Sequence, residues 1–139
     1  MSKKHGKKLK KLKKQQDTVT IKLEPDESYP VFCFKYLQRY SYHECKDPSF
    51  FVEFLERLQK LASLGWKGIN GSHRHSFGIE KMPISKLKPK KMPSIVTEEV
   101  KELTVFRASG SNLPFLGLRI SDTFQVIFIE TSFGDIYDH

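Results

Sequence analysis

Residues 103–139 read LTVFRASGSNLPFLGLRISDTFQVIFIETSFGDIYDH, and this stretch decides the expected fold. Four of its runs are rich in β-branched and aromatic residues and predict strands at 103–108, 115–120, 124–131 and 135–138. Turns of two or three residues, each with a serine, separate the runs, so neighbouring strands are expected to pair as an antiparallel meander. Residues 126–129 are apolar on both faces, which predicts a strand at the centre of the sheet with a helix covering one side.

Two more strands and a helix are expected before this stretch. Residues 18–23 alternate between apolar and polar side chains, and residues 31–37 are apolar on both faces, so these two runs are predicted to pair. Asp47 is expected to cap a helix that has Pro48 at its first position and ends at Gly65. The apolar positions of this helix recur at helical spacing: Phe51, Phe54, Leu55, Leu58, Leu61 and Ala62.

The predicted fold class is therefore α+β. An antiparallel sheet of two N-terminal strands and a C-terminal meander of three or four strands is expected to pack on one main helix. A chain of 139 residues with 38% hydrophobic and 12% aromatic residues predicts one domain at 17–139, after an N-terminal tail. Mean hydropathy of −0.47, without a long apolar run, predicts no membrane span. Cys33 and Cys45 are too few for a disulfide scaffold, and no export signal is recognised, so free thiols and a cytoplasmic location are expected.

Residues 1–16 are expected to form a disordered polybasic tail. Of the 24 basic and 16 acidic side chains in the chain, eight lysines and no acid lie within residues 1–14, which leaves 16 of each sign in the rest. A lysine run of this kind binds phosphates by releasing counterions and does not read sequence. The tail is interpreted either as a means of attraction to nucleic acid or as a solubilising arm.

A second basic segment lies inside the domain. Its lysines fall within an acid-free stretch at 81–91: Lys81, Lys86, Lys88, Lys90 and Lys91. Pro83, Pro89 and Pro93 predict an extended loop here rather than a helix, because proline bars helical conformation in the residues before it. The loop is interpreted either as a rim that contacts RNA phosphates or as a solvated linker.

The glycine-framed loop His73-Arg74-His75 is a candidate RNA-binding site, because two imidazoles beside a guanidinium can contact a phosphate and loops often carry function. The alternative is a chance pair of histidines in a surface loop. A zinc site would need His43 and Cys45 to converge with His73 and His75, but no zinc-binding motif is present, so no metal is predicted. Nucleotide-binding glycine loops are absent as well, so no cofactor is predicted.

A candidate catalytic group lies in the C-terminal strands. Side chains alternate along a strand, so Tyr137 and His139 are expected on one face. Arg107 and Arg119 lie on neighbouring strands whose register the sequence leaves open. A metal-free ribonuclease needs a base, an acid and cations around the phosphate, and these residue types supply them. The alternatives are a frayed terminal histidine and arginines whose stems cover apolar surface. Trp66 is interpreted as a core residue rather than a base-stacking platform.

The strings LTVFRASG, PFLGLRISDTFQVIFIE and DIYDH resemble the C-terminal half of the RelE, YoeB and HigB toxin ribonucleases. The resemblance covers residues 103–139, with the helix at 48–64 as support, and implies an enzyme that cuts mRNA on the ribosome within a toxin–antitoxin module. By motif position Arg119 matches the strand arginine of that family, and Arg107 is a looser match. Tyr137 and His139 match its C-terminal pair. The chain departs from the family in its extra N-terminal strand, its single helix, its proline–lysine loop and its formally neutral body.

Two function classes follow from the sequence. The first is an RNA-binding, toxin-like endoribonuclease or translation inhibitor that uses a basic, histidine-bearing strand surface, with RNA, the ribosome or an antitoxin protein as partners. The second is a non-catalytic small interaction protein of phage or mobile-element origin, whose sheet edge or lysine loop docks a partner. The RNA target, the partner and the oligomeric state stay open at this stage.

Overall fold

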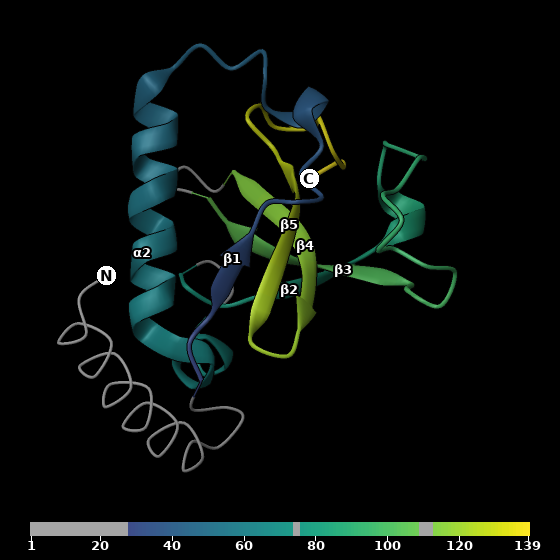
Figure 1. The fold of residues 1–139 in the computed structure, drawn as a ribbon. Helices are drawn as coiled ribbons and strands as arrows, with labels where there is room; N and C mark the ends of the chain where they lie inside the picture. Colours follow the sequence, from purple (N-terminus) through teal and green to yellow (C-terminus); the bar gives the residue numbers. More distant parts are fainter. Residues whose placement is uncertain (1–27, 74–75, 109–112) are drawn as a thin grey trace, which may run out of the picture.

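The computed structural model describes residues 28–73, 76–108 and 113–139 (Figure 1). One main helix packs against a five-stranded sheet, so the predicted α+β class is confirmed. The predicted lysine tail and the predicted strand at 18–23 lie outside the described residues. No helix in the described part of the chain is long and apolar enough to cross a bilayer.

The sheet has the spatial order β1-β5-β4-β3-β2, with β4 in the middle. Its strands are β1 (Val31–Cys33), β2 (Glu80–Pro83), β3 (Glu102–Arg107), β4 (Pro114–Ile120) and β5 (Thr123–Ile129). Short 3-10 turns lie at η2 (Arg39–Ser41) and η3 (Ile84–Lys86). The pairs β2·β3, β3·β4 and β4·β5 are antiparallel, as the meander predicted.

β1 departs from the prediction because it is shorter and pairs in parallel with β5. Only Val31–Cys33 of the expected run 31–37 is a strand, and Phe32 aligns with Phe124. The sheet is therefore mixed and not purely antiparallel. The Phe32 ring packs edge-on against Phe115 and Phe124, each at 6.2 Å between centroids, and this contact between distant segments is not encoded in the local pattern.

The prediction of a last strand at 135–138 is wrong. Residues 131–139 fold as turns across the sheet. The Ile136 carbonyl accepts a hydrogen bond from the Lys88 N–H at 2.7 Å, and the Ile136 N–H donates to the Glu130 carboxylate at 3.0 Å. A side-chain acceptor thus takes the place of the strand partner that the sequence pattern predicted.

The main helix, α2 (Pro48–Asn70), begins as predicted, because the Asp47 side chain accepts a hydrogen bond from the Ser49 N–H at 3.0 Å. Gly65, the predicted end, is instead a kink with φ 80° and ψ 163°, after which one more turn follows. This left-handed φ suits glycine, which lacks a Cβ. Trp66 comes next and is fully buried, as predicted for a core residue. Its main-chain N–H donates to the Ser28 carbonyl at 2.9 Å.

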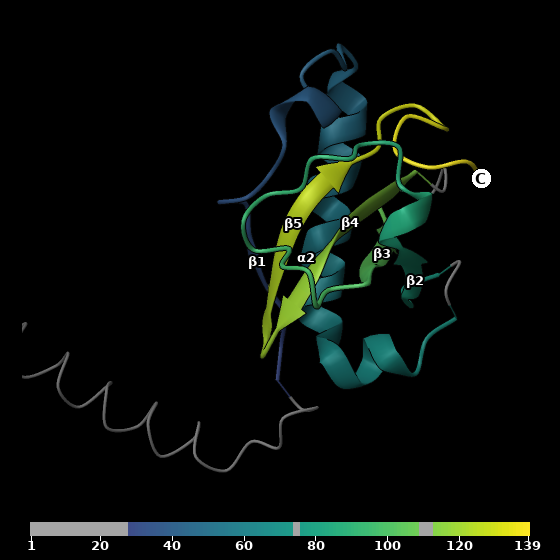
Figure 2. The ribbon, with the colours of Figure 1, turned by 90° about the vertical axis from the view of Figure 1, so that its right-hand side faces the viewer.

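Both faces of the sheet are covered. α2 packs on one face, here called the helix side, and residues 84–100 with the C-terminal segment cross the other, here called the outer side (Figure 2). The helix-side core is mainly aromatic and includes Phe54, Trp66, Phe106, Phe115 and Phe124. The outer core is mainly aliphatic and includes Leu87, Leu103, Leu116, Ile127 and Ile136.

The extended loop predicted at 81–91 is in part regular structure. Glu80–Pro83 form the edge strand β2, and Ile84–Lys86 form η3. Leu87 is fully buried in the outer core and fixes the segment to the sheet. The prolines exclude an α-helix here, but one apolar anchor is enough to hold the segment against the sheet.

A β-bulge in β5 changes the alternation of that strand. Leu116 aligns with Phe128 and Gly117 aligns with Val126, so Ile127 is one extra residue. Ile127 and Phe128 both enter the outer core, and Ile129 returns to the helix side. A Cβ built at Gly117 would overlap the main-chain oxygen of Gln125, so the strands approach this closely only because the residue is glycine.

We predict that Gly117→Ala lowers the free energy of unfolding by about 3 kcal/mol, because the added methyl group meets backbone that cannot move aside. Urea denaturation followed by Trp66 fluorescence measures this change. Gly71→Ala is the control, since a Cβ there would lie at an ordinary 3.5 Å from the Lys67 carbonyl oxygen, and it should change stability by less than about 0.5 kcal/mol. Equal losses in the two variants would contradict the close approach at the bulge.

Candidate functional site

The first candidate site is the C-terminal cluster, which we define as Glu80, Arg107, Glu130, Tyr137 and His139. Glu80 begins β2, Arg107 ends β3, and Glu130 directly follows β5, so three strands position these side chains at one end of the sheet. The centroid of the Tyr137 ring lies 4.3 Å from that of the His139 imidazole. Burial raises the pKa of the Tyr137 phenol, and the positive charge of Arg107 is close enough to act on that pKa in the opposite direction. The structure thus brings together three of the four residues that the sequence proposed as catalytic.

Glu130 organises one half of the C-terminal cluster. Its side chain is fully buried and accepts hydrogen bonds from the Gly134 N–H at 3.2 Å and the Ile136 N–H at 3.0 Å. It also pairs with Nε2 of His139, whose side chain keeps 25% of its surface exposed. A buried carboxylate needs such partners, so this arrangement fastens the C-terminal segment to the end of β5.

Arg107 organises the other half. It is 7% exposed, and its Nη2 atom lies 2.7 Å from Oε1 of Glu80 in a hydrogen-bonded ion pair. Burial raises the pKa of Tyr137, against the opposing effect of the Arg107 charge, so the phenol stays protonated at neutral pH. The C-terminal cluster therefore holds a protonated phenol, the Arg107–Glu80 ion pair and the contact between His139 and Glu130, so each of the two carboxylates already has a partner within the protein.

Arg119 does not join this cluster. Its guanidinium lies 4.0 Å above the Trp66 ring on the helix side, and its Nε donates to the Ser121 carbonyl at 2.8 Å. Arg119 aligns with Phe124, and the six residue steps from Phe124 to Glu130 correspond to about 20 Å along the strand. The guanidinium of Arg119 and the imidazole of His139 thus lie on opposite faces and near opposite ends of the sheet.

The residues predicted to bind RNA are spread over the surface, and several have partners within the protein. The Nζ atom of Lys81 bonds to the Thr104 hydroxyl at 2.6 Å, and that of Lys90 bonds to the Leu87 carbonyl at 2.8 Å. Lys88 pairs with Asp138 at 3.0 Å and also bonds to the Gly134 carbonyl. The remaining predicted positions with a described placement are exposed: His73, Lys86 and Lys91. Arg74 and His75 lie outside the described residues.

The zinc alternative finds no geometric support in the part of the chain that the structure describes. Within residues 28–73, 76–108 and 113–139, no three or more histidine, cysteine, aspartate or glutamate side chains are placed to hold a metal ion. His43 and Cys45 lie in the segment before α2, and His75 is not among the described residues.

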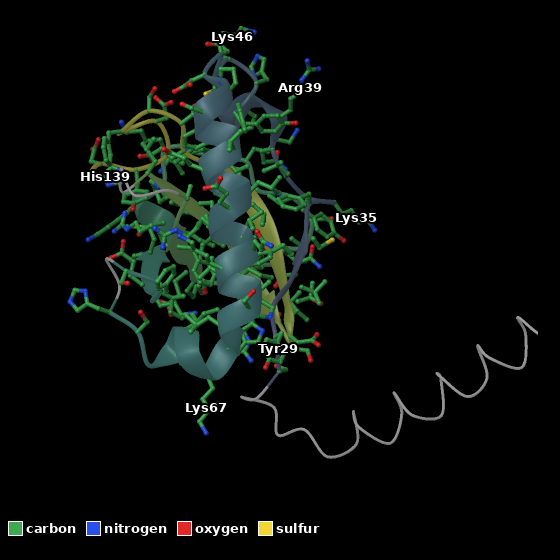
Figure 3. All side chains as sticks on the ribbon, turned by 90° about the vertical axis from the view of Figure 1, so that its left-hand side faces the viewer. Tyr29, Lys35, Arg39, Lys46, Lys67 and His139 are labelled. Atoms are coloured by element: carbon green, nitrogen blue, oxygen red, sulfur yellow. The ribbon has the colours of Figure 1, made fainter. Side chains whose placement is uncertain are left out.

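A second candidate site, the β1–α2 groove, was not predicted. It has a volume of about 840 Å³, and its lining is mostly apolar: Pro30, Val31, Phe32, Val52, Leu55, Glu56, Leu58, Gln59 and Ala62. Three of these side chains are well exposed although they are large and apolar, namely Val31 and Val52 at 56% and Leu55 at 69%. Figure 3 shows Tyr29 and Lys35, which flank β1, on the opposite side of α2 from His139, so the groove is separate from the C-terminal cluster.

The sequence held a signal for this groove. Leu55 was assigned to the apolar face of the helix, but the buried stripe of α2 consists of Phe50, Phe54, Leu58, Leu61 and the residues that follow them. Val52 and Leu55 lie outside this stripe and give the helix more apolar positions than one packed face requires. Such a surplus is typical of a helix with a second contact surface.

Comparison with protein-family models, with curated proteins and with solved structures found no match to this chain. The resemblance to toxin ribonucleases therefore stays a prediction.

We predict that Glu130→Ala lowers the free energy of unfolding by about 3 kcal/mol, because it leaves the buried Ile136 N–H and the half-buried Gly134 N–H without an acceptor. Glu130→Gln should cost about half as much, since its amide oxygen still accepts one of these bonds. Denaturation gives the global effect, and hydrogen exchange at the Ile136 amide should speed up in Glu130→Ala. Unchanged exchange at Ile136 in Glu130→Ala would contradict this role.

Proposed function

We propose that this chain is a non-catalytic interaction protein and that the β1–α2 groove is its docking surface for apolar side chains of another protein. The observation that carries the proposal is the exposure of Val31, Val52 and Leu55 around one groove. Single exposed apolar residues are normal on protein surfaces, whereas a contiguous set marks an interaction site. Burying these three side chains on association supplies the hydrophobic driving force.

The polar lining supports a specific contact. Glu56 and Gln59 stand on α2 beside Leu55 in the wall of the groove. An interface with an apolar centre and polar groups at its margin resembles known protein docking sites, in which the polar rim sets orientation. A partner with a lysine or arginine near Glu56 is favoured over one with an acid there.

The C-terminal cluster supports a catalytic role less well. A metal-free ribonuclease must present its base and its cations to the phosphate and the ribose. Here His139 is paired with Glu130, and Arg107 is paired with Glu80 in a largely buried position. These contacts explain Arg107 and His139 as structural partners. The ribonuclease hypothesis therefore rests on the residue types of the cluster and on the sequence resemblance.

We predict that inducing the full chain in a bacterial host leaves growth and the length distribution of mRNA unchanged, because the C-terminal cluster holds its charged groups in internal pairs. Growth curves and transcript sequencing check this, with His139→Ala as the matched variant. Cleavage of mRNA by the natural chain that His139→Ala abolishes would contradict the proposal in favour of the ribonuclease hypothesis.

We also predict that peptides selected against the full chain from a displayed library of linear peptides bind at the groove. Their affinity for Leu55→Lys should fall by about tenfold or more, because the variant removes an apolar contact and adds a charge that must lose water. Leu55 is 69% exposed, so the substitution should leave the fold intact. Titration calorimetry measures the affinities.

Leu64→Lys is the matched control, since Leu64 is also an exposed leucine of α2 but lines a neighbouring groove with Lys60 and Phe77, which shares Glu56 and Gln59 with the β1–α2 groove but not Leu55. This variant should bind the peptides within about twofold of the natural chain. Equal weakening by both substitutions would contradict the proposal. A monomer–dimer equilibrium that Leu55→Lys abolishes would assign the groove to a second copy of the chain and would contradict it as well.

A further inference from the structure

The outer edge of β1 leads to an inference that rests on the proposed function. β1 stands at the end of the sheet order, so one of its sides faces β5 and the other faces away from the described sheet. The Val31 N–H donates to the Asp122 carbonyl at 3.0 Å, which directs the main chain of Val31 toward β5. Main-chain directions alternate along a strand, so the N–H and C=O groups of Phe32 point away from the sheet.

The neighbours of Phe32 set the length of this edge. Pro30 offers a carbonyl but has no N–H, and the Phe34 carbonyl already accepts a hydrogen bond from the Leu37 N–H at 3.1 Å. Among the described residues, the main-chain groups that face outward along this edge are therefore the N–H and C=O of Phe32, flanked by the Pro30 carbonyl and the Phe34 N–H. This edge matches an added strand of about five residues.

The side chains beside the edge suit the same kind of ligand. Alternate side chains of an extended segment point to opposite faces. A segment laid along β1 places one set over Val52 and Leu55 of α2 and the other set beside the exposed Val31. Figure 3 shows β1 running alongside α2, with Tyr29 at one end of the strand and Lys35 at the other.

We propose that β1 binds an extended, alternately apolar segment of the partner protein by strand addition, which extends the five-stranded sheet by one strand. Main-chain hydrogen bonds to Phe32 hold the segment, and every second side chain enters the β1–α2 groove. A helical partner fits less well, because its main-chain groups are already paired and would leave those of Phe32 without partners.

The test uses the full chain and an end-blocked peptide of sequence Lys-Val-Thr-Val-Thr-Val-Lys in three forms. One form is unmodified, one is N-methylated at every valine, and one is N-methylated at every threonine. In strand addition only one alternate set of N–H groups faces β1. We therefore expect one methylated peptide to bind at least about tenfold more weakly than the unmodified peptide, and the other to bind within about threefold of it. In NMR spectra the Phe32 amide should shift, and its hydrogen exchange should slow.

Each other outcome counts against strand addition. Two methylated peptides that bind alike, whether well or badly, would contradict it, and so would an unmodified peptide without binding at about 1 mM. Library-selected peptides can also be methylated in both patterns. If their affinity still falls in Leu55→Lys but neither pattern of methylation weakens it, docking at the groove is supported and only strand addition is contradicted. Tighter peptide binding by a full-chain Ile21→Lys variant would assign the edge to the chain's own residues 18–23 and would also contradict the inference.

Discussion

The extra residue in β5 is the constraint on which the rest of the structure depends. With strict alternation from Val126, Ile129 would face the outer side and Glu130 the helix side. The bulge at Ile127 reverses this order, so Ile129 joins the aromatic core under α2 and the Glu130 carboxylate meets the C-terminal segment. The main chains come close enough for this pairing only because Gly117 lacks a side chain.

Once Glu130 points to the outer side, its burial requires donors, and the C-terminal segment supplies them. The turns at 131–139 bring two N–H groups and the His139 imidazole to the carboxylate. They also bring Tyr137 beside Arg107, whose charge is balanced by Glu80. A histidine, a tyrosine and an arginine gather here as they do in some nucleases, yet in this fold Arg107 and His139 contact the carboxylates of Glu80 and Glu130. The β1–α2 groove, an apolar surface left open in the described residues, lies on the other side of α2.

Local chemistry in the sequence was sufficient for much of the fold. The Asp47 cap and the helical spacing predicted α2, because the hydrogen bonds of a helix lie within it, and short turns predicted the antiparallel order of β3, β4 and β5.

The partner of β1 was not predictable, since its pairing with β5 joins distant segments. The sequence placed Arg107 and Arg119 on neighbouring strands but left their register open, so it did not show their partners, Glu80 and Trp66. Residues 135–138 have the composition of a strand. Only the position of the Glu130 carboxylate shows why the Ile136 N–H donates to a side chain and not to a neighbouring strand. Helical spacing likewise did not show how wide the buried face of α2 is, so it did not separate the exposed Leu55 from the buried Phe54 and Leu58.

The carbonyl of Asp122 joins three parts of the molecule at one atom. It accepts hydrogen bonds from the Val31 N–H and from the indole N–H of Trp66, each at 3.0 Å, and it lies in the turn between β4 and β5. The start of the strand that borders the groove is thereby linked directly to the ring of the only tryptophan in the chain. The protein carries a built-in fluorophore whose surroundings are coupled to the geometry of its open edge.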